Sequence, residues 1–180
     1  MIAFDTETTG LPVAMNMPLD RQPHIIEFAA IKLDDDTLEE KDRIEFLCKP
    51  PISIPPIITN ITGITDDKLK DEKPFSAYMK PLVNFFIGEK VLIAHNIDFD
   101  RKLLMFELSR MGMMTNFPWP PIHICTVEKT TFIKGHRLKL GELYEIATGN
   151  KIKDAHRAMN DVEALCASIA WLKAEGNSLR

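Results

Sequence analysis

The sequence predicts an α/β fold with a mixed β-sheet, and three observations lead to this prediction. Segments with strand composition open the chain, helices and apolar strands alternate from residue 75 onward, and an amphipathic helix lies close to the C-terminal end. A length of 180 residues, with 45% hydrophobic and 27% charged residues, suits one globular domain. We therefore expect a single domain over residues 1–180.

Three strands are expected within the first fifty residues. Residues 1–4 (MIAF), 24–33 (HIIEFAAIKL) and 43–50 (RIEFLCKP) are rich in β-branched and aromatic side chains. The acidic run at 34–42 is expected to connect the second and third strands as a hairpin. Residues 13–23 contain two prolines and have no periodicity, which predicts a long loop after the first strand.

The second half of the chain alternates helices with short buried strands. Apolar side chains recur at helical spacing from Phe75 to Phe86, and the apolar run 91–94 (VLIA) that follows suits a buried strand. We expect a helix from about 98 to 112, a strand at 122–126 and a helix near 138–148 that ends at a glycine. The last helix has one apolar stripe at spacings of three and four residues, made of Ala158, Val162, Leu165, Ile169 and Leu172.

The cysteine content and the absence of long apolar runs indicate which cellular compartment and which kind of metal site to expect. The three cysteines are far apart, and none has a second cysteine at metal-ligand spacing, which argues against a disulfide framework and against zinc. No apolar run is long enough to span a bilayer, and the N-terminus enters a strand pattern directly, so we expect a soluble, cytoplasmic protein. The net charge of -4 does not indicate nucleic-acid binding, but residues 129–157 carry seven basic and three acidic side chains. This segment is either a solvated face or a polyanion-binding surface.

Carboxylates occur where predicted strands end and predicted helices begin. Asp5 and Glu7 are two residues apart at the end of the first strand, so their side chains should point to the same face, with helix capping as the alternative. Asp98 stands where a helix N-cap is expected, and Asp100 lies near the positive end of the same helix. Asp161 lies on the buried stripe of the last helix, where an unpaired carboxylate would be costly, so it needs a compensating partner.

His156 precedes Asp161 by five residues, which corresponds to about 140° around a helix. The two side chains can therefore share a site only if His156 lies on the connection before the helix. A lone histidine is more often an ordinary surface or core residue, and that alternative stays open on spacing alone.

Four carboxylates from strand ends and helix starts can converge at one edge of an open α/β sheet. Two carboxylates about 4 Å apart repel each other by about 4 kcal/mol at an effective dielectric constant of about 20, so four together require cations or protons. An all-oxygen ligand set favours hard ions. We therefore expect two divalent cations, Mg²⁺ or Mn²⁺.

Three segments resemble the motifs of the DEDDh (DnaQ-like) exonucleases, the superfamily that includes the epsilon proofreading subunit of bacterial DNA polymerase III. They are FDTETTGL at 4–11, HNIDFD at 95–100 and HRAMND at 156–161. NITGIT at 60–65 and HRLKLGELYEIATG at 136–149 extend the resemblance over essentially the whole chain. Any single motif is weak, but the ordered set is highly specific.

The resemblance implies a ribonuclease H-like fold, with a mixed five-stranded sheet flanked by helices. It also implies metal ligands at Asp5, Glu7, Asp100 and Asp161, and a general base at His156. Residues that contact the terminal nucleotide are carried over to Thr8 and Leu11, with His95 and Phe99 as further candidates. For Leu11, core packing is the alternative, and Asp98 stands where many members have a small residue.

The leading function is a metal-dependent 3′–5′ exonuclease that releases 5′-mononucleotides from single-stranded nucleic acid, with DNA favoured over RNA. Its expected partners are a single-stranded 3′ end and, in proofreading or repair, a DNA polymerase or other replication proteins. Because the chain stops soon after the last helix, a free-standing enzyme or one that docks through its surface is preferred. The alternatives are an exoribonuclease that trims RNA, a catalytically silent nucleic-acid-binding module, and a scaffold with a structural calcium site.

Overall fold

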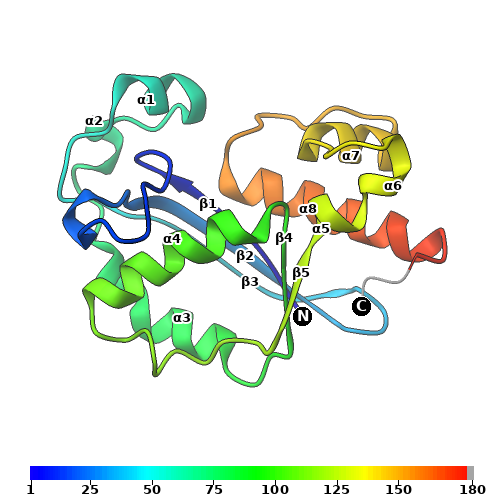
Figure 1. The fold of residues 1–180 in the computed structure, drawn as a ribbon, viewed down its shortest axis with the longest axis horizontal. Coiled ribbons are helices and arrows are strands. Elements are labelled where there is room, and N and C mark those ends of the chain that lie inside the picture. Colours follow the sequence, from blue (N-terminus) through cyan, green and yellow to red (C-terminus); the bar gives the residue numbers. More distant parts are fainter. Residues whose placement is uncertain (178–180) are drawn as a thin grey trace.

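The computed structural model describes residues 1–177, and its centre is a five-stranded sheet in the order β3-β2-β1-β4-β5 (Figure 1). The strands are β1 (Ile2–Thr8), β2 (Ile25–Leu33), β3 (Glu40–Leu47), β4 (Val91–Ala94) and β5 (Ile122–Cys125). β1, β2 and β3 pair antiparallel, whereas β4 runs parallel to both β1 and β5. The predicted mixed five-stranded sheet is confirmed.

Two strand boundaries differ from the expectation, and the first of them affects the acids. β1 continues to Thr8, so Asp5 and Glu7 lie within the strand and not after it. The pairing of β1 with β2 becomes irregular directly after Glu7. β3 begins at Glu40 because the hairpin is tight, with the carboxylate of Asp34 accepting backbone N–H groups two and three residues later.

Helices cover both faces of the sheet (Figure 1). One face packs against α3 (Met79–Phe86) and α4 (Ile97–Arg110) in a core rich in phenylalanine. The other face packs against α8 (Ala158–Ala174), whose apolar stripe is buried as predicted. A third, smaller cluster lies under α1 (Pro56–Thr62) and α2 (Asp66–Leu69). Functional groups on α4 and α8 therefore approach the sheet from opposite faces.

Several short elements complete the fold within the described residues. The 3₁₀ turns are η1 (Leu19–Arg21) and η2 (Phe75–Tyr78), and the remaining helices are α5 (Thr126–Lys129), α6 (Thr131–Lys134) and α7 (Leu140–Thr148). α7 starts two residues later than expected, after the N-cap Lys139, whose backbone N–H donates to the carboxylate of Glu142 at 2.9 Å, and it ends at Gly149 in the left-handed conformation as predicted. None of the helices in residues 1–177 has the length and apolar character needed to cross a bilayer.

The start of α4 corrects one prediction. The N-cap residue is Asn96, and the helix begins at Ile97, so the assignment of the cap to Asp98 is wrong. The chain reverses immediately after β4 through a left-handed conformation at Asn96, with φ of 72°. Asparagine adopts this conformation more readily than most residues do. The side chain of Asp98 is exposed on the second residue of the helix.

The long loop at 13–23 is held against α4 by Arg110. Its Nη2 donates hydrogen bonds to the carbonyl oxygens of Leu19, Gln22 and Pro23 at 2.9, 2.8 and 3.0 Å. Its Nη1 forms an ion pair of 2.9 Å with the buried carboxylate of Glu107. The loop between β1 and β2 is therefore anchored at its C-terminal end.

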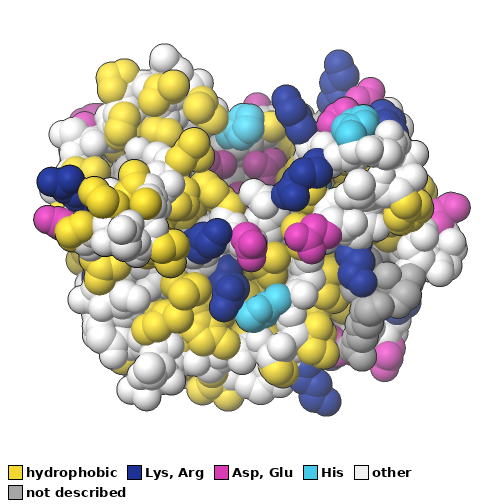
Figure 2. Space-filling view, viewed as in Figure 1, with side chains coloured by type: hydrophobic (Ala, Val, Ile, Leu, Met, Phe, Trp, Pro, Cys, Tyr) yellow, Lys and Arg dark blue, Asp and Glu magenta, His cyan; other side chains and the backbone are white. Residues whose placement is uncertain are grey.

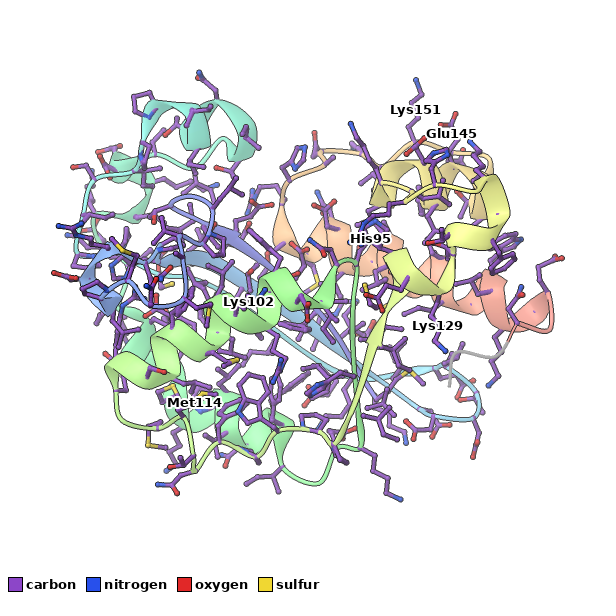
Figure 3. All side chains as sticks on the ribbon, in the orientation of Figure 1. His95, Lys102, Met114, Lys129, Glu145 and Lys151 are labelled. Carbon is purple, nitrogen blue, oxygen red and sulfur yellow. The ribbon has the colours of Figure 1, made fainter. Side chains whose placement is uncertain are left out.

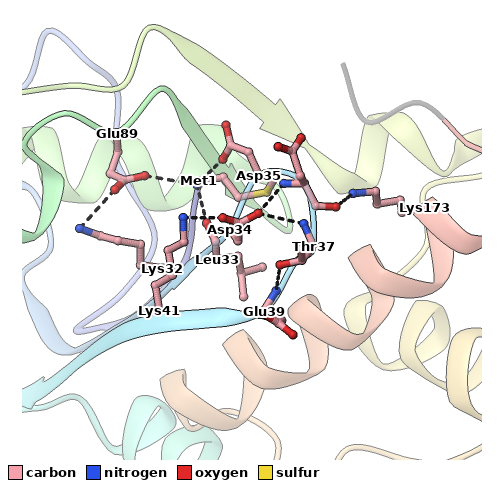
Figure 4. Close-up of polar contacts among 11 residues, drawn as sticks. Met1, Lys32, Leu33, Asp34, Asp35, Thr37, Glu39, Lys41, Glu89 and Lys173 are labelled. Atoms are coloured by element: carbon pink, nitrogen blue, oxygen red, sulfur yellow. Dashed lines mark hydrogen bonds and ion pairs between the residues drawn. The ribbon is translucent and has the colours of Figure 1, made fainter.

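Polar contacts fix the opposite end of β1, away from the acids (Figure 4). The ammonium group of Met1 pairs with Asp35 at 2.6 Å and with Glu89 at 3.2 Å. Lys173, near the end of α8, donates to the carbonyl oxygen of Asp36 in the hairpin. These contacts tie the far ends of β1 and α8 to the same hairpin.

Candidate active site

The acidic pair on β1 lies beside an open edge of the sheet. β1 pairs with β4 at Ile2 and Ala3, and β4 then ends, so within residues 1–177 the β4-facing edge of β1 beyond this point has no partner strand. Asp5 and Glu7 are both half-buried and share the face of β1 that packs against α8. The sheet thus presents two carboxylates where groups from both of its faces can reach them.

Asp100 reaches this edge from α4. Its side chain is 3% exposed, and its Oδ1 accepts hydrogen bonds from the backbone N–H and the hydroxyl of Thr6 at 3.0 and 2.8 Å. The N–H of Thr6 is available because no strand pairs with β1 there. The open edge therefore fixes Asp100 next to the acidic pair.

Asp161 and His156 come from the start of α8. Asp161 is 9% exposed, and its Oδ2 accepts the backbone N–H of His156 at 3.1 Å. His156 lies on the connection before the helix, as predicted, with an exposed side chain and a φ of 65°. One ring nitrogen of His156 and one carboxylate oxygen each of Glu7 and Asp161 all lie within 4.8 Å of one another. These three ligand atoms are close enough to hold one metal ion.

Burial and mutual repulsion raise the pKa of every acid in this group. Burial, followed by the negative charges of Asp100 and Glu7, raises the pKa of Asp5 well above its ordinary value. The pKa of Glu7 is raised to about 8, first by burial and then by Asp161. Burial raises the pKa of Asp100 to about 7 although the hydrogen bonds from Thr6 lower it. Burial also raises the pKa of Asp161, against the lowering effect of the His156 N–H.

The residues present fit a hard divalent cation. The donors that converge are carboxylate oxygens with one imidazole, and Cys48, Cys125 and Cys166 are free thiols that do not belong to the cluster. Carboxylates crowded at low exposure are stabilised by a cation that replaces the lost water and offsets their repulsion. The electrostatics of the acids and the chemistry of the donor atoms therefore both indicate a hard divalent cation.

Comparison with known proteins identifies the family. A family model described as Exonuclease (RNase_T) matches residues 2–168. The chain belongs to this exonuclease family. The predicted resemblance to the DEDDh exonucleases and the prediction of a nuclease are confirmed.

The relatives of this exonuclease include much longer polymerases. The PolC-type DNA polymerase III of Halalkalibacterium halodurans is 34% identical over 168 residues, which cover 91% of this chain and 10% of that protein. The same polymerase of Bacillus subtilis is 31% identical over 168 residues, or 91% of this chain and 11% of that protein. The chain thus spans about a tenth of the length of these curated relatives.

Solved structures confirm the ribonuclease H-like fold of the exonuclease. The nuclease domain of 3′hExo, a DEDDh family member bound to rAMP, superposes with a TM-score of 0.77 at 20% identity, covering 99% of this chain and 94% of that one. E. coli Exonuclease I in complex with a dT13 oligonucleotide gives a TM-score of 0.77 at 20% identity, covering 96% and 40%. At 20% sequence identity, these two structures show a similarity of fold alone.

The predicted substrate contacts lie in different environments. Thr8 is buried, and its hydroxyl donates to the carbonyl oxygen of Gly10 at 2.8 Å. Leu11 is 78% exposed, so the alternative of core packing is wrong for it. Phe99 is partly buried against the core beneath α4. The roles of these residues in substrate binding stay predictions.

His95 makes internal contacts with both ring nitrogens. Nε2 lies 3.0 Å from the carbonyl oxygen of Leu138, and Nδ1 lies 2.9 Å from the hydroxyl of Thr126. Because a carbonyl only accepts, Nε2 carries a proton and donates a hydrogen bond to Leu138, and burial lowers the pKa of His95. Figure 3 shows His95 at the end of β4, below α7. In this position it connects β4 to the segment that leads into α7, and its role as a substrate contact stays a prediction.

The surface around the acids is hollowed between two lobes of different chemistry (Figure 2). Hydrophobic side chains gather on the lobe that contains α1, where Ile57 and Ile61 are 66% and 48% exposed. Basic side chains gather on the lobe that contains α6 and α7, and acidic ones lie between the lobes. A cavity of about 430 Å³ extends under the second lobe to His156 and Asp161.

The basic segment at 129–157 does not form one continuous face. Figure 3 shows Lys151 beyond α7 and Lys129 on the opposite side of that lobe. Arg137 reaches the start of α4, where its guanidinium donates to the side chain of Asn96 at 3.3 Å. Only a part of the segment is therefore positioned beside the acids.

Sequence reasoning missed two residues next to the site, Glu27 and Arg157. Glu27 is fully buried on β2 and pairs with Arg157 at 2.6 Å. The signal was present, because Glu27 interrupts the otherwise apolar run IIEFAAI in a strand buried on both faces. Thr6, which fixes Asp100, was missed as well.

Proposed function

We propose that this exonuclease removes nucleotides one at a time from the 3′ end of single-stranded DNA and releases 5′-mononucleotides. The observation that carries the proposal is the convergence of four carboxylates and one histidine from β1, α4 and α8 at the open edge of the sheet. The proposal treats residues 1–180 as one catalytic domain, of which 178–180 lie outside the described residues. A cytoplasmic location stays a prediction.

Asp5, Glu7, Asp100 and Asp161 would hold two divalent cations, Mg²⁺ or Mn²⁺. Such a pair, when bound, supplies Lewis-acid activation of the attacking water and neutralises charge on the leaving oxygen. The chain contributes the carboxylates in a nearly fixed arrangement, since Asp100 is held by Thr6 and Asp161 by the His156 N–H. Fixed ligands keep the reorganisation that accompanies the reaction small.

His156 is the proposed general base. Its ring is exposed, and one of its nitrogens lies beside the oxygens of Glu7 and Asp161. An unprotonated imidazole nitrogen is a proton acceptor, so the ring can take a proton from the attacking water at this nitrogen. The exposed position then lets the ring return the proton to solvent.

The hollow between the two lobes is the proposed path of the strand. Nucleobases can lie against the hydrophobic lobe, where Ile57 and Ile61 are exposed, because burying a base face on an apolar surface removes both from water. Phosphates can contact the basic lobe, where Arg137 and Lys139 are exposed. This arrangement suits a single strand, whose bases and backbone are both accessible.

DNA is preferred over RNA because the 30–34% identical relatives are named as DNA polymerases. The same names support a setting beside a polymerase in proofreading or repair. The nuclease domain of 3′hExo was solved with rAMP, which keeps an exoribonuclease as the second candidate.

A matched digestion tests the proposal. DNA and RNA strands of one sequence, each labelled at the 5′ or the 3′ end, are incubated with the protein and Mg²⁺, Mn²⁺ or Ca²⁺. We expect a stepwise ladder from 5′-labelled DNA and immediate release of labelled mononucleotide from 3′-labelled DNA. Faster loss of RNA would favour the second candidate, and release from the 5′ end would contradict the direction.

Two further outcomes would contradict hydrolysis itself. Tight strand binding with no cleavage under any metal would indicate a silent binding module. A melting temperature raised by Ca²⁺, without cleavage, would indicate a structural calcium site.

A further inference from the structure

A fifth carboxylate, Glu27, lies beside the four acids of the site. Glu27 on β2 is the direct register partner of Glu7 on β1. Side chains of directly opposed residues in antiparallel strands lie on the same face, so the two carboxylates are neighbours. Glu27 is completely buried, and its negative charge contributes to the raised pKa of Glu7. An acid in this position needs strong partners to remain in the core.

Both oxygens of Glu27 are occupied by the residues that follow His156. Arg157 donates from Nη2 to Oε1 at 2.6 Å, and from Nε to Oε1 and Oε2 at 3.1 and 3.2 Å. The backbone N–H of Ala158, the first residue of α8, donates to Oε2 at 3.0 Å. Paired arginine–carboxylate contacts are strong and directional, and the carboxylate also lies at the positive end of a 17-residue helix. Glu27 is therefore engaged in holding the chain at Arg157.

His156 is consequently fixed on both sides. Its own N–H is bound by Asp161, and the next residue is bound by Glu27. Its φ of 65° is an uncommon conformation for a residue other than glycine, and such conformations persist where the surroundings enforce them. The two anchors are the groups that enforce it here.

We propose that Glu27 and Arg157 are positioning residues that hold His156 over the carboxylates through a partly buried ion pair. The proposal rests on the proposed role of His156 as the general base. Without the pair, the connection before α8 loses one of its two anchors, and the ring of His156 leaves the oxygens of Glu7 and Asp161 for much of the time. Because small misplacements of a reacting group are costly, we expect kcat to fall about 10- to 100-fold.

The test compares Arg157→Gln, Glu27→Gln and the double variant with the wild type on 5′-labelled single-stranded DNA. We expect each single variant to lose kcat with little change in KM, and the double variant to lose no more than the worse single variant, because both act through one contact. Arg43→Gln is the matched control. Arg43 also pairs with α8, through Glu163 at 3.0 Å, but lies on the exposed side of β3, so its replacement should leave kcat unchanged.

A second readout needs no metal and no activity. Amide hydrogen exchange in the metal-free protein should increase at His156 and Ala158 in Arg157→Gln and stay unchanged in the β1–β2 ladder. If Arg157→Gln does not fold, Arg157→Lys keeps the charge without the paired geometry and supplies the same comparison. Unchanged kcat in the folded variants, or equal exchange at both amides, would overturn the positioning role. A wild type that cleaves nothing under any metal would instead refute the proposed function, and the exchange data would still test the anchor.

Discussion

Replacing Glu7 with glutamine should stabilise the metal-free protein and remove stabilisation by metal. Glu7 is half-buried among Asp161, Glu27 and Asp100, and its pKa is raised from 4.5 to about 8. Above this pH the folded protein must keep a carboxylate where burial and three negative neighbours oppose it. Glutamine has nearly the same shape and no charge, so it removes this cost while it also removes a metal ligand.

The size of the effect follows from the pKa. One pKa unit corresponds to about 1.36 kcal/mol, so the change from 4.5 to about 8 sets an upper limit of about 5 kcal/mol. Because solvent reaches part of the side chain and screens these interactions, we expect a gain of about 1–2 kcal/mol in the free energy of unfolding at pH 8.5. For a domain of this size, that gain corresponds to an increase of roughly 2–8 °C in Tm.

The assay is urea unfolding at pH 8.5, with EDTA and then with saturating Mn²⁺. With EDTA, Glu7→Gln should unfold at higher urea than the wild type. With Mn²⁺, the wild type should gain more than the variant, because binding to the folded state adds RT ln(1 + [L]/Kd). Glu39→Gln, on the exposed hairpin, is the control and should change neither midpoint. A Glu7→Gln variant that is less stable in EDTA, or that gains as much from Mn²⁺ as the wild type, would refute the reasoning.

Three further predictions concern catalysis, pH and the strand path. His156→Ala should lower kcat about 10²- to 10⁴-fold, the usual range for a general base, while the affinity for a single strand, measured by gel shift with Ca²⁺, stays within about threefold. Undiminished turnover would remove His156 from its role. Because the pKa values of Glu7 and Asp100 are raised, the folded protein binds more protons than the unfolded chain. The urea midpoint of the metal-free protein should therefore fall as the pH rises from about 5.5 to about 8.5. A midpoint that rises with pH would contradict this prediction. The double variant Arg137→Ala, Lys139→Ala should bind single-stranded DNA with a weaker salt dependence. The slope of log K, the binding constant for the strand, against log[salt] should fall by about 0.7 for each phosphate that the variant no longer neutralises. An unchanged slope would place the strand elsewhere.

The spacing of apolar residues predicted α8 and the inward-facing position of Asp161. The stripe from Ala158 to Leu172 is buried, and Asp161, which shares this stripe, is 9% exposed. The geometry of a helix also predicted that His156 must lie outside it. Such arguments succeed because they depend only on the spacing of residues within one element.

Features that depend on how two elements meet were not predictable in the same way. The hydrogen bonds from Thr6 to Asp100 exist because β4 is short and leaves the edge of β1 open. The cap of α4 falls at Asn96 because of the sharp turn after β4, although Asp98 is also a residue type that commonly caps helices. The pairing of Glu27 with Arg157 joins residues 130 positions apart. Strand register and helix docking decide these contacts, and neither is a property of a local window of sequence.

If Asp5, Glu7, Asp100 and Asp161 together bind two divalent ions at which the phosphodiester is cleaved, these ions must lie among the four side chains. The most direct measurement is anomalous diffraction from crystals soaked with Mn²⁺ and a nucleoside 5′-monophosphate. We expect two manganese peaks among these four side chains, with the phosphate beside them. Manganese bound elsewhere while these carboxylates stay without metal, or Asp161 lying apart from Asp5, would contradict it.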